Sequence, residues 1–361
     1  MPRFFIDPNI ARARTISTEV YTSPAIFEEA KEKIFAPSWQ FVGDTGRVAE
    51  PGSVWPFMLL EGYLNEPLLL SHDKVGALHC MSNVCTHRGN LLAYEPCTSS
   101  QLRCRYHGRV FGLDGKFQFM PEFSEVENFP TEADDLKQLP LFRWGDLLFS
   151  SLNPAVPPEK FLGEMMQRLP KTFRMDRLEF RPELSNDYNV NANWALYCEN
   201  YLEGFHIPFV HGSLSAVLDW GSYTTEIFRF ANLQLGIGKK GDACFDLPPD
   251  SPDFGKDVAA YYFWVFPNMM FNFYPWGLSL NVVEPQSVGT CKVRFLVYVL
   301  DESKLGTGAG DGLGQVELED EEVVENVQRG IRSRFYAHGR YAPQREQGTH
   351  HFHSLLAEVL G

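Results

Sequence analysis

Two short stretches of the 361-residue sequence, CTHRG at residues 85–89 and CRYHG at residues 104–108, decide how the first half of the chain is built. Each stretch places a cysteine and a histidine close together and ends in a glycine, which lets the backbone of a tight turn approach a bound group without a Cβ clash. Thiolate and imidazole groups are both good metal ligands. The two stretches therefore predict one metal site assembled from two similar turns.

The four candidate ligands are Cys85, His87, Cys104 and His107. In a Rieske-type [2Fe–2S] cluster, two cysteines hold one iron and two histidines hold the other. A structural zinc site also takes two cysteines and two histidines, but zinc fingers group them as a cysteine pair and a histidine pair. Because each half of this pattern holds one of each, the sequence favours the iron–sulfur cluster over zinc.

The sequence around this pattern is typical of a small all-β domain. From Trp39 to about Pro154, short β-rich runs alternate with Gly, Pro, Asn and Asp turns. A proline cluster at residues 154–158 is interpreted as a linker. Beyond it, apolar and aromatic strands are accompanied by helices, including a long one expected over residues 316–339.

We therefore predict an α+β chain with two domains. The first is the all-β domain at residues 37–153, which carries the cluster. The second is formed by residues 1–36 and 154–361 and has an antiparallel sheet packed by helices.

A second set of metal-ligand candidates lies in NWALYCENYLEGFHIPFVH, residues 193–211. Glu203 and His206 are three residues apart, so a helix would place them on one face. Pro208 is expected to end that helix and to let His211 turn back toward the same side. Two histidines and one carboxylate with open coordination positions form the site of non-haem Fe(II) oxygenases. The alternative is that both are ordinary histidines on a half-buried helix.

The third ligand of such an iron would be a carboxylate distant in sequence. Spacing alone cannot choose among the members of one acidic run, because a solvated helix face would have the same composition. The six candidates in this run are Glu317, Glu319, Asp320, Glu321, Glu322 and Glu325.

Residues 85–89 and 104–108 resemble the Rieske motif of the aromatic-ring-hydroxylating oxygenases and related N-demethylating monooxygenases. Residues 193–211 are similar to the pattern NWxxxxENYxExYHxxxxH of that family, and residues 320–330 to its DxxxxExVQRG. Glu203, at a position where most members carry aspartate, makes the sequence most similar to the quaternary-amine monooxygenases that oxidise carnitine, choline or glycine betaine.

The resemblance implies a role for each candidate residue. The ligands it implies are Cys85, His87, Cys104 and His107 for the cluster, and His206, His211 and Asp320 for a mononuclear Fe(II). It also implies that Glu203 bridges a cluster histidine of one subunit to an iron-binding histidine of the next, with its second oxygen free for that contact. The resemblance also implies a homotrimer, in which the cluster of one subunit supplies the iron of the next.

The same resemblance implies an oxygenase component that works with a separate flavin and iron–sulfur reductase. Electrons from NAD(P)H would reach the iron through the cluster, and O₂ would be used to hydroxylate or oxidatively demethylate a small organic substrate. A quaternary amine is one such substrate. Two alternatives stay open: a ring-hydroxylating dioxygenase acting on an aromatic substrate, and a Rieske electron-transfer protein without a catalytic iron.

Two residues beside the cluster motif depart from the family pattern. Arg105 and Arg109 stand where the family commonly has Pro and Trp, and we expect them to alter docking of an electron donor or a neighbouring subunit. The HHFH segment at residues 350–353 is expected on a surface helix. The five cysteines outside the motif are expected to be buried small hydrophobic residues.

Composition excludes several classes of protein. The 32 Lys and Arg against 46 Asp and Glu give a net charge of −14, which argues against a nucleic-acid partner. The N-terminus lacks an apolar signal segment, and no run is long enough to span a membrane. Seven cysteines, an odd number, argue against a disulfide scaffold. We therefore expect a soluble cytoplasmic protein.

Overall fold

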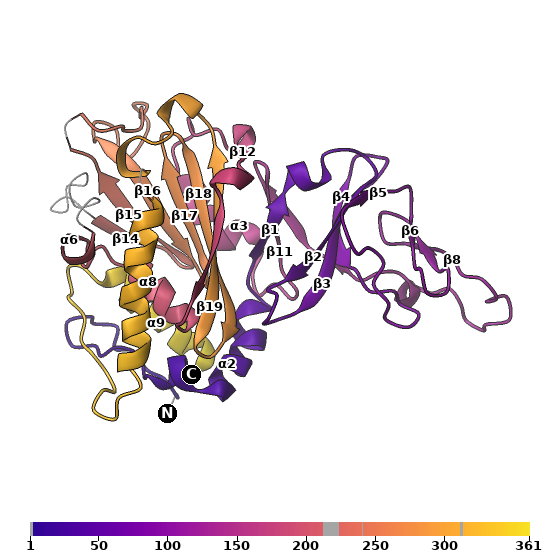
Figure 1. The fold of residues 1–361 in the computed structure, drawn as a ribbon, viewed down its shortest axis with the longest axis horizontal. Helices are drawn as coiled ribbons and strands as arrows, with labels where there is room; N and C mark the ends of the chain where they lie inside the picture. The colour runs from indigo at the N-terminus through magenta and orange to yellow at the C-terminus, as the bar shows by residue number, and fades with distance from the viewer. Residues whose placement is uncertain (1–2, 212–223, 240, 311–312) are drawn as a thin grey trace. The chain divides into compact units, whose positions relative to one another are not determined.

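A computed structural model of the chain describes residues 3–211, 224–239, 241–310 and 313–361 (Figure 1). Its contacts divide it into two compact units. The β unit is Ala36–Pro154, and the α+β unit is Met1–Phe35 together with Ala155–Gly361. The β unit is thus inserted between two parts of the other. No helix in the described ranges is long and apolar enough to cross a membrane.

The β unit is built from three antiparallel sheets, with strand orders β1-β11-β10, β5-β2-β3-β4-β9 and β6-β7-β8. Leu69 and Met81, on the central strands of the largest sheet, belong to a buried apolar core that also contains Cys85 and Cys104. The strands are β1 (Gln40–Asp44), β2 (Ser53–Leu59), β3 (Glu66–His72), β4 (Leu78–Ser82), β5 (Cys97–Thr98), β6 (Leu102–Arg103), β7 (Val110–Phe111), β8 (Phe117–Phe119), β9 (Gln138–Leu139), β10 (Leu141–Trp144) and β11 (Leu147–Ser150).

The α+β unit contains an eight-stranded antiparallel sheet of order β12-β19-β18-β17-β16-β15-β14, in which β13 also pairs with β19. Every residue of β16 and β17 is buried, which explains why apolar residues follow one another in these strands, interrupted only by Asn272 in β17, instead of alternating with polar ones. The strands are β12 (Glu179–Phe180), β13 (Asn186–Val190), β14 (Thr224–Ile227), β15 (Ala231–Ile237), β16 (Val258–Val265), β17 (Met269–Tyr274), β18 (Gly277–Ser287) and β19 (Thr290–Val299).

Helices accompany this sheet, and the predicted α+β class is confirmed. The helix α5 contacts β18 and β19 and also α8, so it connects α8, which carries the acidic run, to the sheet. The helix α8 ends at Gly330, short of the predicted Gly339. The α-helices are α1 (Glu19–Thr22), α2 (Pro24–Ala30), α3 (Pro158–Phe161), α4 (Gly163–Arg168), α5 (Trp194–Tyr201), α6 (Ile207–Val210), α8 (Leu313–Gly330) and α9 (Gln347–Leu360), and Lys31–Phe35 forms one π-helical turn.

The segment that links α5 to α6 differs from the predicted single helix. The helix α5 ends at Tyr201, two residues before Glu203. The carboxylate of Glu203 accepts the backbone N–H groups of Phe205 and His206, and these bonds replace helical ones. Pro208 lies in the first turn of α6, where its missing N–H is not needed. The predicted shared helical face is therefore wrong, and Pro208 begins a helix instead of ending one.

Two smaller expectations are also wrong. His353 of the HHFH segment is fully buried. Its Nε2 atom lies 3.1 Å from the hydroxyl oxygen of Tyr21, and its Nδ1 atom lies 2.5 Å from that of Tyr341. Cys97 is exposed, and Cys244 is half-buried against a core cluster, whereas Cys80, Cys198 and Cys291 are buried as expected.

Candidate metal centres and cavity

The two cysteine–histidine stretches form matching turns in the β unit. The N–H of Gly89 donates to the carbonyl of Cys85 at 3.0 Å, and that of Gly108 donates to the carbonyl of Cys104 at 3.0 Å. The two glycines have φ of +70° and +77°, which side chains rarely adopt. In both turns, the cysteine N–H donates at 2.8 Å to the carbonyl of the residue five positions later. The same backbone geometry is therefore built twice.

The side chains of these turns fit a metal cluster. Cys85 and Cys104 are each 2% exposed, and the rings of His87 and His107 lie 4.7 Å apart between centroids. Burial raises the pKa of Cys85, and the neighbouring thiol of Cys104 raises it further. The buried Nδ1 of His107 has no hydrogen-bond partner among the described residues. Buried polar atoms seldom stay unpaired, so a metal ion at this nitrogen is the simplest partner.

The arginines that depart from the family motif lie in different surroundings. Arg105 is exposed, with its guanidinium 5.1 Å from the centroid of the Tyr94 ring. Arg109 is 2% exposed. A side chain this deeply buried cannot face a docked partner, so for Arg109 the expected docking role is wrong.

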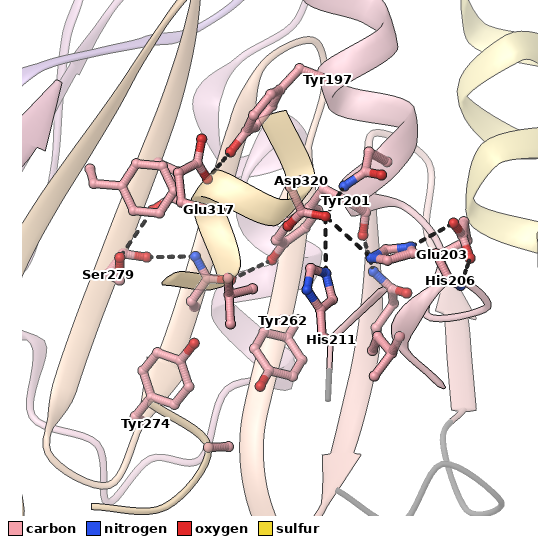
Figure 2. A pocket seen from close by; sticks show the side chains of 18 residues that line it. Tyr197, Tyr201, Glu203, His206, His211, Tyr262, Tyr274, Ser279, Glu317 and Asp320 are labelled. Atoms are coloured by element: carbon pink, nitrogen blue, oxygen red, sulfur yellow. Dashed lines mark hydrogen bonds and ion pairs between the residues drawn. The ribbon is translucent and has the colours of Figure 1, made fainter. Parts of the chain in front are cut away.

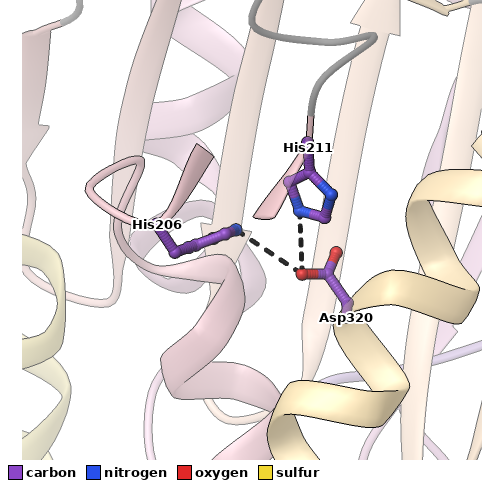
Figure 3. Close-up of side chains that lie close together, drawn as sticks. All are labelled: His206, His211 and Asp320. Carbon is purple, nitrogen blue, oxygen red and sulfur yellow. Dashed lines mark hydrogen bonds and ion pairs between the residues drawn. The ribbon is translucent and has the colours of Figure 1, made fainter. Parts of the chain in front are cut away.

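A second group of ligand atoms comes together in the α+β unit (Figure 3). One atom each of His206, His211 and Asp320 can be chosen so that all lie within 4.8 Å of one another. The Oδ1 atom of Asp320 is 3.0 Å from Nε2 of His211 and 3.5 Å from Nε2 of His206. Asp320 is brought in by α8, and the histidines flank α6. Two histidines and one carboxylate are the ligand set with which non-haem Fe(II) oxygenases hold their iron while leaving coordination positions for O₂ and substrate.

In both histidines, a carboxylate contacts the Nδ1 atom, on the opposite side of the ring from Asp320. The Nδ1 atom of His206 lies 2.7 Å from Oε1 of Glu203, and Nδ1 of His211 lies 2.8 Å from Oε2 of Glu319. Such contacts favour the tautomer with Nδ1–H and direct Nε2 toward a metal. Burial lowers the pKa of His211, but Asp320 and Glu319 outweigh it and the net pKa is raised. Sequence reasoning included Glu319 only as a candidate ligand and missed this supporting contact.

The remaining acidic residues of α8 do not join the metal group. Glu325 accepts hydrogen bonds from Asn191, and Glu322 is exposed as a solvated helix face predicts. Glu317 is buried and accepts a hydrogen bond from the hydroxyl of Tyr197 at 2.5 Å. Glu321 is half-buried, and burial raises its pKa. The structure thus separates six residues that spacing alone could not distinguish.

A cavity of about 110 Å³ opens beside the histidines and Asp320 (Figure 2). Tyrosines form much of its wall, including Tyr201, Tyr262 and Tyr274. The hydroxyl of Tyr201 donates to the amide oxygen of Asn272 at 2.9 Å, which fixes that ring in place. In the described part of the chain, no lysine or arginine lines this cavity. Its acidic lining residues are Glu203, Glu317 and Asp320.

Glu317 differs from the other two carboxylates because it is not engaged with the histidines. It is 3% exposed, and its Oε1 atom has no hydrogen-bond partner among the residues that the structure describes. Burial raises its pKa to about 8. An unpaired buried carboxylate oxygen is unfavourable unless a ligand supplies a compensating charge or donor.

Comparisons with known sequences cover both units. Residues 38–130 match the family described as Rieske [2Fe-2S] domain, and residues 175–361 match Ring hydroxylating alpha subunit (catalytic domain). The choline monooxygenase of Beta vulgaris is 31% identical over 368 residues, covering 98% of this chain and 79% of the relative. The carnitine monooxygenase oxygenase subunit of Escherichia coli K12 is 27% identical over 375 residues, covering 98% of this chain and 95% of the relative.

Comparison with solved structures gives the same fold. The quaternary ammonium Rieske monooxygenase CntA, in complex with an inhibitor, superposes with a TM-score of 0.81 at 24% identity, covering 98% of this chain and 97% of the other. A Rhodococcus naphthalene 1,2-dioxygenase superposes with a TM-score of 0.76 at 19% identity, covering 96% and 94%. The fold is thus shared by enzymes with different substrates.

Proposed function

Because this chain belongs to the Rieske non-haem iron oxygenases, we propose that it is the oxygenase component that oxidises a small methylated ammonium compound. As a member of that family it is an O₂-dependent oxidoreductase with a Rieske [2Fe–2S] cluster and a mononuclear iron. The match over residues 175–361 to a catalytic domain disfavours an electron-transfer protein without catalytic iron. The dioxygenase alternative is less supported, because the two relatives named above, at 31% and 27% identity, are monooxygenases.

The residues proposed to hold the cofactors are Cys85, His87, Cys104 and His107 for the cluster and His206, His211 and Asp320 for the iron. When bound, the cluster supplies electrons one at a time, and the iron activates O₂ for insertion of one oxygen atom into a C–H bond. The protein's part is to hold two Nε2 atoms and one carboxylate oxygen in place. Glu203 and Glu319 do so by accepting the Nδ1–H groups of the two histidines.

The observation that carries the substrate class is the unpaired carboxylate oxygen of Glu317 in a cavity walled by tyrosines. A quaternary ammonium group has no N–H to donate, so it is recognised by opposite charge and by the faces of aromatic rings. Tyr262 and Tyr274 are buried lining residues whose centroids lie 5.9 Å apart in an edge arrangement. A phosphorylated substrate would find no lysine or arginine among the described lining residues, which disfavours it.

Oxidation of an N-methyl substrate consumes one O₂ molecule and accounts for all atoms and electrons. One C–H bond of the methyl group becomes C–OH, and the second oxygen atom of O₂ is reduced to water with two electrons and two protons. The N–CH₂OH product then loses its hydroxyl proton and breaks its C–N bond, which releases formaldehyde and leaves the amine with one methyl group fewer. The electrons come from NAD(P)H through a separate flavin and iron–sulfur reductase.

Electron transfer between subunits of a homotrimer is part of the proposal. Oε2 of Glu203 is already used by two backbone N–H groups, so the expectation of a free second oxygen is wrong. A carboxylate oxygen has two lone pairs, and Oε1 can accept from a second imidazole besides His206. Exposed aromatic residues beside both centres, Tyr106 at 59% and Phe209 at 79%, suit an interface between copies. We place this assembly in the cytoplasm, which would keep the free thiols reduced.

The direct test is turnover with the purified oxygenase and a compatible reductase. Carnitine, choline, glycine betaine and an aromatic hydrocarbon are supplied separately, and O₂ uptake and formaldehyde are measured. Product formation coupled to O₂ uptake with a methylated ammonium compound is expected. Coupled turnover of the hydrocarbon alone would contradict the proposed substrate class.

A further inference from the structure

Arg109 is a charged side chain buried inside the β unit. Its guanidinium lies 5.6, 4.9 and 5.4 Å from the ring centroids of Phe111, Phe117 and Phe129. One of its nitrogens donates to the carboxylate of Asp134 at 2.7 Å and to the carbonyl of the same residue at 3.1 Å. Burying an arginine among phenyl rings is unfavourable without such a partner, so the pair is a specific arrangement.

The Arg109–Asp134 pair is tied to both ligand turns. The backbone carbonyl of Arg109 accepts the N–H of Cys104 at 2.8 Å in the second turn. The carbonyl of Asp134 also accepts the hydroxyl of Thr86 at 2.8 Å, and Thr86 lies between the two ligands of the first turn. A displacement of Arg109 and Asp134 would therefore change the geometry of both ligand turns.

The two charges of the pair are not equally screened. The side chain of Arg109 is 2% exposed, whereas that of Asp134 is 21% exposed and reaches solvent. The guanidinium of Arg109 and the hydroxyl of Thr86 donate to the same carbonyl of Asp134, at 3.1 and 2.8 Å, which places the positive charge beside the first ligand turn. Charges in a low-dielectric interior act over longer distances than exposed ones. The positive end of the pair is thus the end that acts on the ligand site.

We propose that Arg109 is a positioning residue that raises the reduction potential of the cluster through its buried positive charge, and that Asp134 holds this charge in place. The inference rests on the proposed cluster ligands. Reduction adds one negative charge to the cluster, and a nearby buried cation stabilises that reduced form.

The test is a spectroelectrochemical titration of the holoenzyme and four variants. Arg109→Met removes the charge and is expected to lower the midpoint potential. Arg109→Lys keeps the charge and is expected to restore most of that shift. Asp134→Asn removes the opposing charge and is expected to raise the potential. The matched control is Arg105→Met, the same change at an exposed site in the same turn, whose small shift is expected to vanish at high salt, whereas the Arg109→Met shift persists.

Iron, sulfide and the EPR spectrum are measured for each variant, so that loss of the cluster is not mistaken for a shift. Unchanged potentials in both Arg109→Met and Asp134→Asn with intact clusters would overturn the proposal. If Arg109→Met does not retain the cluster, a potential in Asp134→Asn equal to or below that of the unmodified protein would overturn it. A wild-type cluster without nitrogen ligands would instead refute the cluster assignment itself.

Discussion

At the scale of single residues, the substrate class depends on Glu317. We expect Glu317→Gln to raise KM for a quaternary ammonium substrate about tenfold or more, with a smaller change in kcat, because it removes the buried charge facing the cation. Glu322→Gln is the matched control, since Glu322 is exposed on the same helix. Equal KM values for all three proteins would remove Glu317 from substrate binding.

The pH dependence of KM tests the same residue. Burial raises the pKa of Glu317 to about 8, so the free protein holds the neutral acid below that pH and the carboxylate above it. A cation binds the carboxylate more tightly, so KM is expected to fall as the pH rises from 7 to 9. The Glu317→Gln variant should lack this step, and a step that persists in it belongs to another group.

The two iron-binding histidines give a second prediction at this scale. His206→Ala or His211→Ala is expected to abolish turnover and to lower mononuclear iron, while the cluster spectrum is unchanged, because the two centres use separate ligands in separate units. The exposed His338→Ala serves as control. Wild-type turnover in either variant would exclude that histidine from the site.

At the scale of elements, the segment between α5 and α6 carries Glu203, which is proposed to link the cluster of one subunit to the iron site of the next. Glu203→Gln is expected to retain iron but to slow oxidation of the reduced cluster by O₂ and substrate at least tenfold in a single turnover. Glu319→Gln is the control, because it removes an equivalent contact from the other histidine without touching the bridge. Equal rates in both variants would show that Glu203 only orients His206.

The elements also show what a sequence can and cannot predict. The all-β unit and the buried aromatic strands follow from local pattern, because turn residues and continuous apolar runs determine them. Local pattern does not predict where α5 ends, since the carboxylate of Glu203 competes for backbone N–H groups that a helix would use. The support that Glu319 gives to His211 joins residues 108 positions apart, and no spacing rule reveals it. The burial of His353 could have been predicted, because Thr349, Leu356 and Leu360 share its helical face.

At the scale of the whole molecule, the account requires more than one chain. A mixture of two inactive variants, His107→Ala without a complete cluster and His211→Ala without the iron, is expected to regain activity when the subunits are exchanged. The cluster of one chain then supplies the iron of the next within a closed ring. Sedimentation should show a trimer. A mixture that stays inactive although mixed trimers form would place electron transfer within one chain.

The central claim is that this chain carries two different iron centres. The most direct measurement is iron and sulfide analysis of the purified protein combined with EPR after anaerobic reduction. We predict three irons per chain, two in the cluster and one mononuclear, with the EPR signal of a reduced [2Fe–2S] cluster that has nitrogen ligands. A colourless protein that holds stoichiometric zinc and no inorganic sulfide would contradict the account.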